Sequence, residues 1–353
     1  MSPAAPPQTP SADPPPADAV PAVPTPRAGL FGGYDRLRAA NPVLLGTLLT
    51  ASSALNYSAA NVFLRQMARP VDFDWAVWVT ANKAVVSFLA ALAICLLARR
   101  RGEAGFPPRR LVPSLLLAGF LTQVVGNLCF QYALSLGGLA LTVPLTFSTL
   151  IITGAVGGRL FLREPVRPKT LAAIAVMIAA VFILKGGADE ASAARTGGAG
   201  STTPALLMGC LAGVGYGGVG IVVRSARKAN VPVSATLVWI SATGVFGIGA
   251  LALVRNGPGV FAATAAAEWL WMFLASLGNA VAFFSVAAAY GLLPVKRVNL
   301  VNASQAAIGG VAGVLIFGEP LTGFLIGGTA ATILGLVITS LTGDGRPPAA
   351  GKA

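Results

Sequence analysis

Lys83 is the clearest charged residue deep inside a long apolar run of this sequence. We predict a helix over about residues 75–98, which places Lys83 roughly 12 Å from its start at about 1.5 Å per residue. A lysine at the centre of a membrane helix costs roughly 2.5–3.5 kcal/mol, so a compensating partner is expected. In one interpretation Lys83 faces an aqueous cavity and attracts an anionic group, such as the carboxylate or phosphate of a substrate. In the other it bonds helix carbonyls and holds its helix against its neighbours.

Three amide side chains form a second polar feature in an apolar run. Gln123, Asn127 and Gln131 recur at every fourth residue, so on a helix they form one narrow stripe. Amide groups that face lipid lose their hydrogen bonds, so this stripe must face protein or water. We interpret it as the wall of a cavity, with hydrogen bonding between helices as the alternative.

The segments that carry these side chains are apolar enough to cross a membrane. The chain has 353 residues, of which 55% are hydrophobic and only 10% charged. Several apolar runs of roughly 18 or more residues exceed what a soluble core helix needs. We therefore predict an all-α integral membrane protein of ten transmembrane helices. Their expected ranges are about 43–64, 75–98, 111–134, 139–162, 169–185, 205–224, 233–254, 269–291, 294–317 and 321–341.

An internal repeat organises these helices. Residues 139–166 resemble residues 294–321, and both stretches end in Glu-Pro, at Glu164 and Glu319. Tyr57 and Arg65 in the first half are matched in order and spacing by Tyr216 and Arg224 in the second. Repeated apolar helices are typical of secondary transporters.

The positions that the two copies share predict helix ends and helix packing. A proline after glutamate ends one helix and suits the first turn of the next, and the glutamate favours the N-terminus of that next helix. The pairs Gly154/Gly158 and Gly309/Gly313 form small-residue ridges for close helix approach. We expect packing within the bundle, with a homodimer contact as the alternative to a monomer.

Charge predicts the orientation and the domain boundaries. The net charge of +13 arises from Lys and Arg clustered in alternate loops, which favours membrane topology over a nucleic-acid partner. The positive-inside rule places both termini in the cytoplasm, and an odd number of helices per half then makes the second half inverted. The predicted domains are a disordered Pro/Ala-rich tail over 1–40, a first five-helix repeat over 41–185, a flexible linker over 186–204, a second repeat over 205–341 and a cytoplasmic tail over 342–353.

With these features, the sequence over about residues 43–341 resembles the drug/metabolite transporter superfamily, EamA type. Ten spans in two inverted halves, with the fourth helix of each half ending in Glu-Pro, carry the resemblance. Tyr57-Ser58 and Tyr216-Gly217 stand where the family often has Trp-Gly, and Lys83 stands where it often has arginine. The resemblance implies a transporter that exports an amino acid or a similar small metabolite. Lys83 favours, as the alternative, an anionic substrate such as a nucleotide sugar or an organic acid.

A transporter of this kind binds its substrate near the bilayer midplane, between the halves, and works by alternating access. We expect the polar and aromatic residues of the central spans to line that site. The predicted substrate-binding residues are Lys83, Asn82, Tyr57, Gln123, Asn127, Gln131, Tyr216, Asn279, Asn302 and Gln305.

Other chemistries lack the residues that they need. The chain has no histidine, and every Asp and Glu falls in a predicted loop or at a helix end. We therefore predict no metal, no cofactor and no carboxylate proton relay. A membrane enzyme would need a nucleophile–base pair or a metal cluster, and a membrane scaffold would not need an internal polar stripe. The expected partners are a small-molecule substrate and membrane lipid, and a composition rich in Arg and Ala favours a bacterial inner membrane.

Overall fold

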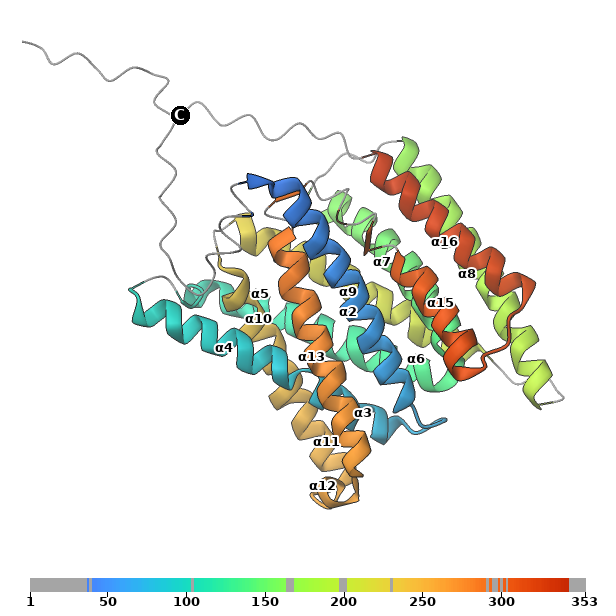
Figure 1. Cartoon of the computed structure of the whole chain (residues 1–353), viewed down its shortest axis with the longest axis horizontal. Coiled ribbons are helices and arrows are strands. Elements are labelled where there is room, and N and C mark those ends of the chain that lie inside the picture. Colours follow the sequence, from blue (N-terminus) through green and yellow to red (C-terminus); the bar gives the residue numbers. More distant parts are fainter. Residues whose placement is uncertain are drawn as a thin grey trace, which may run out of the picture. The chain divides into compact units, whose positions relative to one another are not determined.

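The computed structural model describes residues 37, 40–102, 105–162, 168–196, 202–228, 231–289, 292–293, 298, 301–302 and 304–342. Nearly all of the predicted N-terminal and C-terminal tails, and Glu164, lie outside these residues. All regular structure within them is helical (Figure 1). The predicted all-α fold is therefore confirmed for the part of the chain that is described.

The first half of the chain forms α2 to α8. Its elements are α2 (Pro42–Gln66), α3 (Phe73–Lys83), α4 (Val85–Arg100), the short 3-10 helix η1 (Arg109–Leu111), α5 (Val112–Phe120), the π-helix η2 (Leu121–Leu128), α6 (Cys129–Gly137), α7 (Leu139–Leu162) and α8 (Pro168–Thr196).

The second half of the chain forms α9 to α16. Its elements are α9 (Thr203–Lys228), α10 (Val233–Ala242), the π-helix η3 (Thr243–Ile248), α11 (Gly249–Asn256), α12 (Val260–Ala263), α13 (Ala266–Ala289), α15 (Ser304–Phe317) and α16 (Gly323–Thr342).

Six helical stretches among the described residues are long and apolar enough to cross a membrane. They are Phe73–Arg100, Arg109–Gly137, Leu139–Phe161, Pro168–Gly187, Val233–Asn256 and Ala266–Ala289. Three shorter apolar helices, Thr203–Val219, Ser304–Phe317 and Gly323–Thr339, accompany them. Many large apolar side chains on these helices are exposed, which is what a surface facing lipid requires. The chain is therefore a multi-pass membrane protein.

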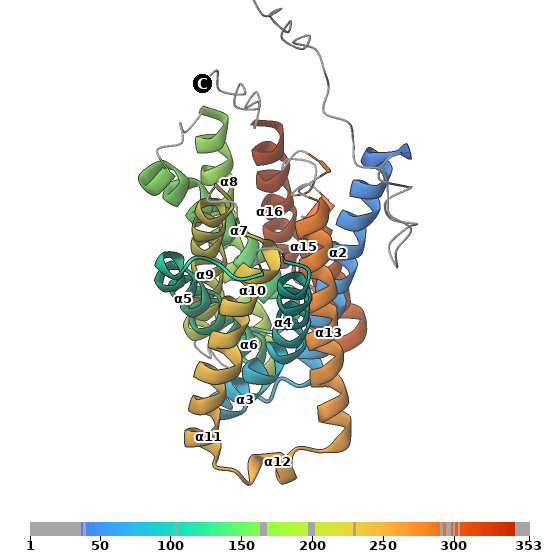
Figure 2. The same cartoon turned by 90° about the vertical axis from the view of Figure 1, so that its left-hand side faces the viewer.

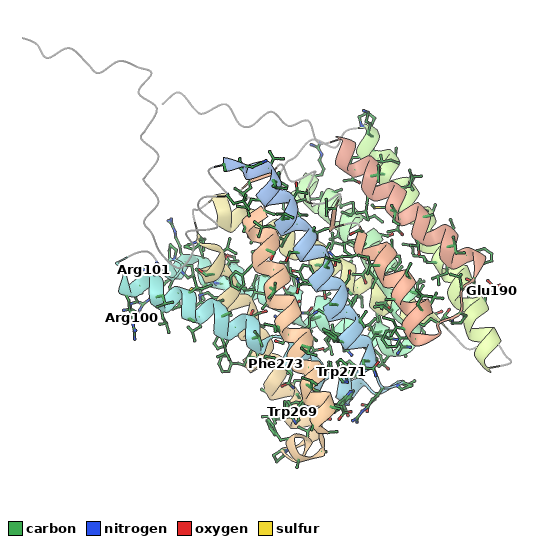
Figure 3. All side chains as sticks on the ribbon, viewed as in Figure 1. Arg100, Arg101, Glu190, Trp269, Trp271 and Phe273 are labelled. Carbon is green, nitrogen blue, oxygen red and sulfur yellow. The ribbon has the colours of Figure 1, made fainter. Side chains whose placement is uncertain are left out.

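Helices from the two halves of the chain pack side by side. α7 lies along α9 and α15, and α8 lies along α16 (Figure 1). At one end of the bundle α12 connects α11 to α13 (Figure 2). Trp269 stacks on Phe261 of α12 and Trp271 stacks on Phe63 of α2, whereas Arg100 and Arg101 lie at the end of α4 that is remote from α3 (Figure 3). Tryptophan and arginine near helix ends are typical interfacial anchors.

Several predicted helices are less regular than the sequence indicates. The helix predicted over 75–98 is interrupted at Ala84, between α3 and α4. Two other predicted helices each contain a π-helical stretch, η2 and η3. Periodicity in the sequence detects long apolar runs, and it does not detect one displaced hydrogen bond within such a run.

The flexible linker predicted over 186–204 is wrong for its first part, because α8 continues to Thr196. Gly186 and Gly187 lie against Phe324 and Leu325 at the start of α16. Packing against a neighbouring helix stabilises a helix beyond what its glycine content suggests.

Candidate functional site

Lys83 lies in a buried network of polar side chains from three helices. Its ammonium group donates a hydrogen bond to Oδ1 of Asn127 at 2.9 Å, and the hydroxyl of Tyr216 donates to the same oxygen at 2.6 Å. The Asn127 amide donates to Oε1 of Gln123 at 2.7 Å. The Gln123 amide in turn donates to the carbonyl of Ile240 on α10 at 3.2 Å. We call these four side chains, Lys83, Gln123, Asn127 and Tyr216, the Lys83 cluster.

The charge of Lys83 has no acidic partner in this cluster. Lys83 is only 7% exposed, and no carboxylate of the described residues lies within ion-pair distance of it. Its ring neighbour is Phe130, whose centroid lies 5.8 Å from the ammonium nitrogen. An ammonium group has three donors, and Asn127 accepts one of them. The cluster therefore offers a buried positive charge with donors left for an anion.

The break between α3 and α4 fixes the position of Lys83. It leaves the Lys83 carbonyl and the Val86 amide without their usual helical partners. Ser276 of α13 satisfies both groups: its hydroxyl donates to the Lys83 carbonyl at 2.8 Å and accepts from the Val86 amide at 3.0 Å. Sequence reasoning missed Ser276, because a serine within an apolar helix gives no signal of its partner.

The π-helix η2 presents the amides of the cluster. Gln123 and Asn127 both lie on it, and both are buried. Single π-helical turns inside α-helices occur frequently at functional sites. Gly126 lets Tyr216 approach, since a Cβ atom there would lie 2.7 Å from the tyrosine ring. Gln123 and Asn127 thus lie on one face, as the predicted polar stripe requires, and their side chains bond directly to each other.

Two further predicted site residues lie next to the cluster. Gln131, one helical turn beyond Asn127, donates to the carbonyl of Leu64 at 3.2 Å. Its Oε1 atom is buried and has no hydrogen-bond partner in the part of the chain that the structure describes. Tyr57 is half-buried, and its side chain is close enough to Tyr216 for the two phenol groups to interact electrostatically.

Four predicted site residues make hydrogen bonds elsewhere. Asn82 bonds the Trp78 carbonyl of its own helix at 2.9 Å, and Asn279 bonds the Ser87 hydroxyl at 3.3 Å. Asn302 bonds the Val298 carbonyl and accepts from Gln305 at 3.1 Å. Among the described residues, these hydrogen bonds do not join the four side chains to the Lys83 cluster, so their role in substrate binding stays a prediction.

The architecture and the two repeats agree with a known family of membrane proteins. The model of the EamA-like transporter family matches residues 44–185 and 203–341, which are the two halves of the helical bundle. The chain belongs to the EamA-like transporter family. It is therefore a membrane transporter built from two repeats, as the resemblance in its sequence indicates.

Comparison with known proteins adds the fold and no substrate. No curated protein sequence matches this EamA-like chain. A solved structure titled "Crystal structure of protein" is similar to it, with 19% sequence identity and a TM-score of 0.50. The similarity covers 84% of this chain and 96% of the other. At that identity the likeness concerns the fold alone.

Proposed function

We propose that this EamA-like protein exports a small metabolite that carries a carboxylate or a phosphate, with the Lys83 ammonium as its counter-charge. The observation that carries the proposal is a buried ammonium group whose one hydrogen bond among the described residues goes to a neutral amide oxygen. Burial of an unpaired charge is costly, and an anionic ligand at this point would reduce that cost. An amino acid is the first candidate substrate, and an organic acid or a nucleotide sugar is the second.

The proposed mechanism is alternating access between two inverted five-helix repeats, with ten membrane spans and both termini in the cytoplasm of a bacterium. Lys83 and Asn127 belong to the first repeat, whereas Tyr216 belongs to the second. Relative movement of the repeats would therefore change the hydrogen bonds of Asn127. A substrate that bonds the same side chains is placed where it biases that movement.

A thermal-shift experiment on purified protein tests the counter-charge. Amino acids, organic acids, nucleotides, sugar nucleotides and quaternary amines are compared on wild type and on Lys83→Ala. Lys185→Ala is the matched control, since Lys185 is an exposed lysine paired with Asp189. A ligand that binds the folded protein raises its melting temperature by mass action.

We expect anionic or zwitterionic compounds to stabilise wild type and Lys185→Ala but not Lys83→Ala. Counterflow in proteoliposomes with the stabilising compound then measures transport directly. Equal stabilisation of wild type and Lys83→Ala would contradict the counter-charge role and leave Lys83 as a structural lysine.

A further inference from the structure

Glu319, in the turn between α15 and α16, is a buried carboxylate that forms three hydrogen bonds. Its Oε1 atom accepts from Nε of Arg65 and from the backbone amide of Leu139, each at 2.8 Å. Its Oε2 atom accepts from the backbone amide of Ala140, also at 2.8 Å. The carboxylate thus occupies the N-terminus of α7, where backbone amides and the helix dipole favour negative charge. Our sequence prediction assigned Glu319 to the helix that follows it, and the structure corrects this.

Two glycines make room for this carboxylate. A Cβ atom at Gly138 would lie 2.4 Å from Oε1, and one at Gly313 would lie 2.5 Å from Oε2. Gly138 also has a φ of 81°, which favours glycine. The predicted ridge at Gly313 therefore serves a close approach of helix and carboxylate, whereas Gly154 has no neighbour within 4 Å of its Cβ position.

Polar residues on η2, α6 and α2 lead from the Lys83 cluster toward this carboxylate, linked partly by hydrogen bonds and partly by adjacency along a helix. Asn127 of the cluster lies one turn before Gln131, and Gln131 bonds the carbonyl of Leu64. The next residue along α2 is Arg65, whose side chain is 20% exposed and pairs with Glu319. The contact of Arg65 and Glu319 thus lies at the last turn of α2, and α2 ends on the side of the bundle that holds α12 (Figure 1).

Two exposed ion pairs join the same two halves of the chain. Arg69 pairs with Glu268 at the start of α13, and Asp74 on α3 pairs with Arg255 at the end of α11, each at 2.7 Å. One member of each pair, Glu268 or Arg255, lies in a helix next to α12 in the sequence. Both pairs therefore lie at the end of the bundle that the positive-inside rule makes extracytoplasmic. Exposed pairs contribute little to stability, whereas removal of one partner from a pair with a buried carboxylate is strongly destabilising.

We propose that Glu319 is the latch of the extracytoplasmic gate. With its three hydrogen bonds made, it holds the ends of α2, α7 and α15 together and closes the way from the Lys83 cluster. Opening at this end requires Glu319 to leave Arg65 and the α7 N-terminus together, which makes the gate a two-state element. This inference rests on the proposed transport function, because a latch has a purpose only if a pathway opens.

Cysteine accessibility tests the latch without any substrate. Ser58 is a suitable reporter, because it is buried and lies two helical turns before Arg65 on α2. Its hydroxyl forms no hydrogen bond with any other described residue. Ser58→Cys is made in wild type, in Glu319→Gln and in Glu268→Gln. A membrane-impermeant cationic thiosulfonate is added on the extracytoplasmic side of oriented membranes, and the labelling rate is measured. The parent chain, with its three native cysteines, gives the background.

We expect Glu319→Gln to raise the labelling rate of Ser58→Cys by about tenfold or more, since loss of a buried ion pair shifts the closed–open equilibrium. Glu268→Gln, the matched control at an exposed pair, is expected to change the rate less than about twofold. Equal labelling rates of Ser58→Cys with and without Glu319→Gln would overturn the latch. So would an equal increase in Glu268→Gln, since it would show general loosening of this end.

A second variant covers failure of Glu319→Gln to fold. Arg65→Gln leaves the two backbone hydrogen bonds of Glu319 in place, so we expect an increase in labelling rate between those of wild type and Glu319→Gln. An unchanged rate in a folded Arg65→Gln protein would overturn the role of the ion pair. The accessibility result is independent of the ligand panel. If Lys83→Ala loses the ligand stabilisation but Glu319→Gln leaves the labelling rate unchanged, only the latch is contradicted. If Glu319→Gln raises the labelling rate but no compound stabilises wild type, only the proposed function is contradicted.

Discussion

The second helices of the two repeats differ in charge at a central position. Val77-Trp78-Val79-Thr80-Ala81 in the first repeat resembles Val238-Trp239-Ile240-Ser241-Ala242 in the second. Because Lys83 and Gly244 each lie five residues after the tryptophan, they are counterparts. Lys83 supplies a buried charge, whereas Gly244 supplies space: a Cβ atom there would lie 2.6 Å from Cβ of Ala84 and 2.8 Å from Cδ of Gln123.

Both copies are nevertheless irregular at this point. α3 ends at Lys83, and the π-helix η3 begins just before Gly244. The two irregular segments contact each other, since Gly244 lies against Ala84. The repeat thus keeps an irregular helix in both halves and places the charge in only one. The irregular geometry therefore belongs to the crossing of the helices, and the charge is the difference that the proposed counter-charge role of Lys83 uses.

The largest effect is expected at Lys83 itself. Lys83→Met keeps the length and apolar stem of the side chain and removes the charge. A hydrogen bond to a charged group is worth about 1.5–3 kcal/mol, so we expect kcat/KM for transport to fall by about 10- to 100-fold. Initial rates in proteoliposomes measure this, and Lys185→Met is the control. Unchanged transport in Lys83→Met would show that the charge at this position of the first repeat has no role in transport.

The counterpart position is expected to affect stability. Gly244→Ala forces a methyl group against Ala84 and Gln123, and overpacking of this kind costs about 1–3 kcal/mol. Gly249→Ala, at the start of α11, is the matched control because nothing lies within 4 Å of its Cβ position. Alanine is the better helix former, so this control should melt at the same temperature as wild type or higher. A Gly244→Ala protein that is as stable as Gly249→Ala would show that the crossing is not tightly packed.

Ser276 offers a way to disturb the break without touching the charge. Ser276→Ala leaves the Lys83 carbonyl and the Val86 amide without their hydrogen bonds. We expect a loss of about 1–3 kcal/mol in stability and a higher KM for transport, because Lys83 loses its fixed position. Ser276→Thr retains the hydroxyl and should recover KM in part. Normal KM in a destabilised Ser276→Ala protein would separate the geometry of the break from ligand binding.

The sequence alone predicts the apolar spans, the repeat and the buried lysine, because each follows from residue type and period. It also predicts that Gln123 and Asn127 share a face, since four-residue spacing places side chains together on a helix. It does not predict that Ser276 bridges the break or that Glu319 reaches α7. Both contacts join residues far apart in the chain, and single polar residues carry no information about distant partners. The glutamate of each Glu-Pro therefore looked like a local helix signal, whereas Glu319 bonds Leu139 and Ala140.

The smallest effect is expected at Asn279, which tests how far the site extends into the second repeat. Its side chain bonds the hydroxyl of Ser87, one turn after Lys83, at 3.3 Å. A bond of this length between neutral groups contributes about 0.5–1.5 kcal/mol, so Asn279→Ala should lower stability slightly and leave KM within about threefold of wild type. Melting temperature and transport kinetics measured together check both parts. A large rise in KM with little loss of stability would place Asn279 at the ligand, and both repeats would then contribute amides to the site, as the sequence prediction has it.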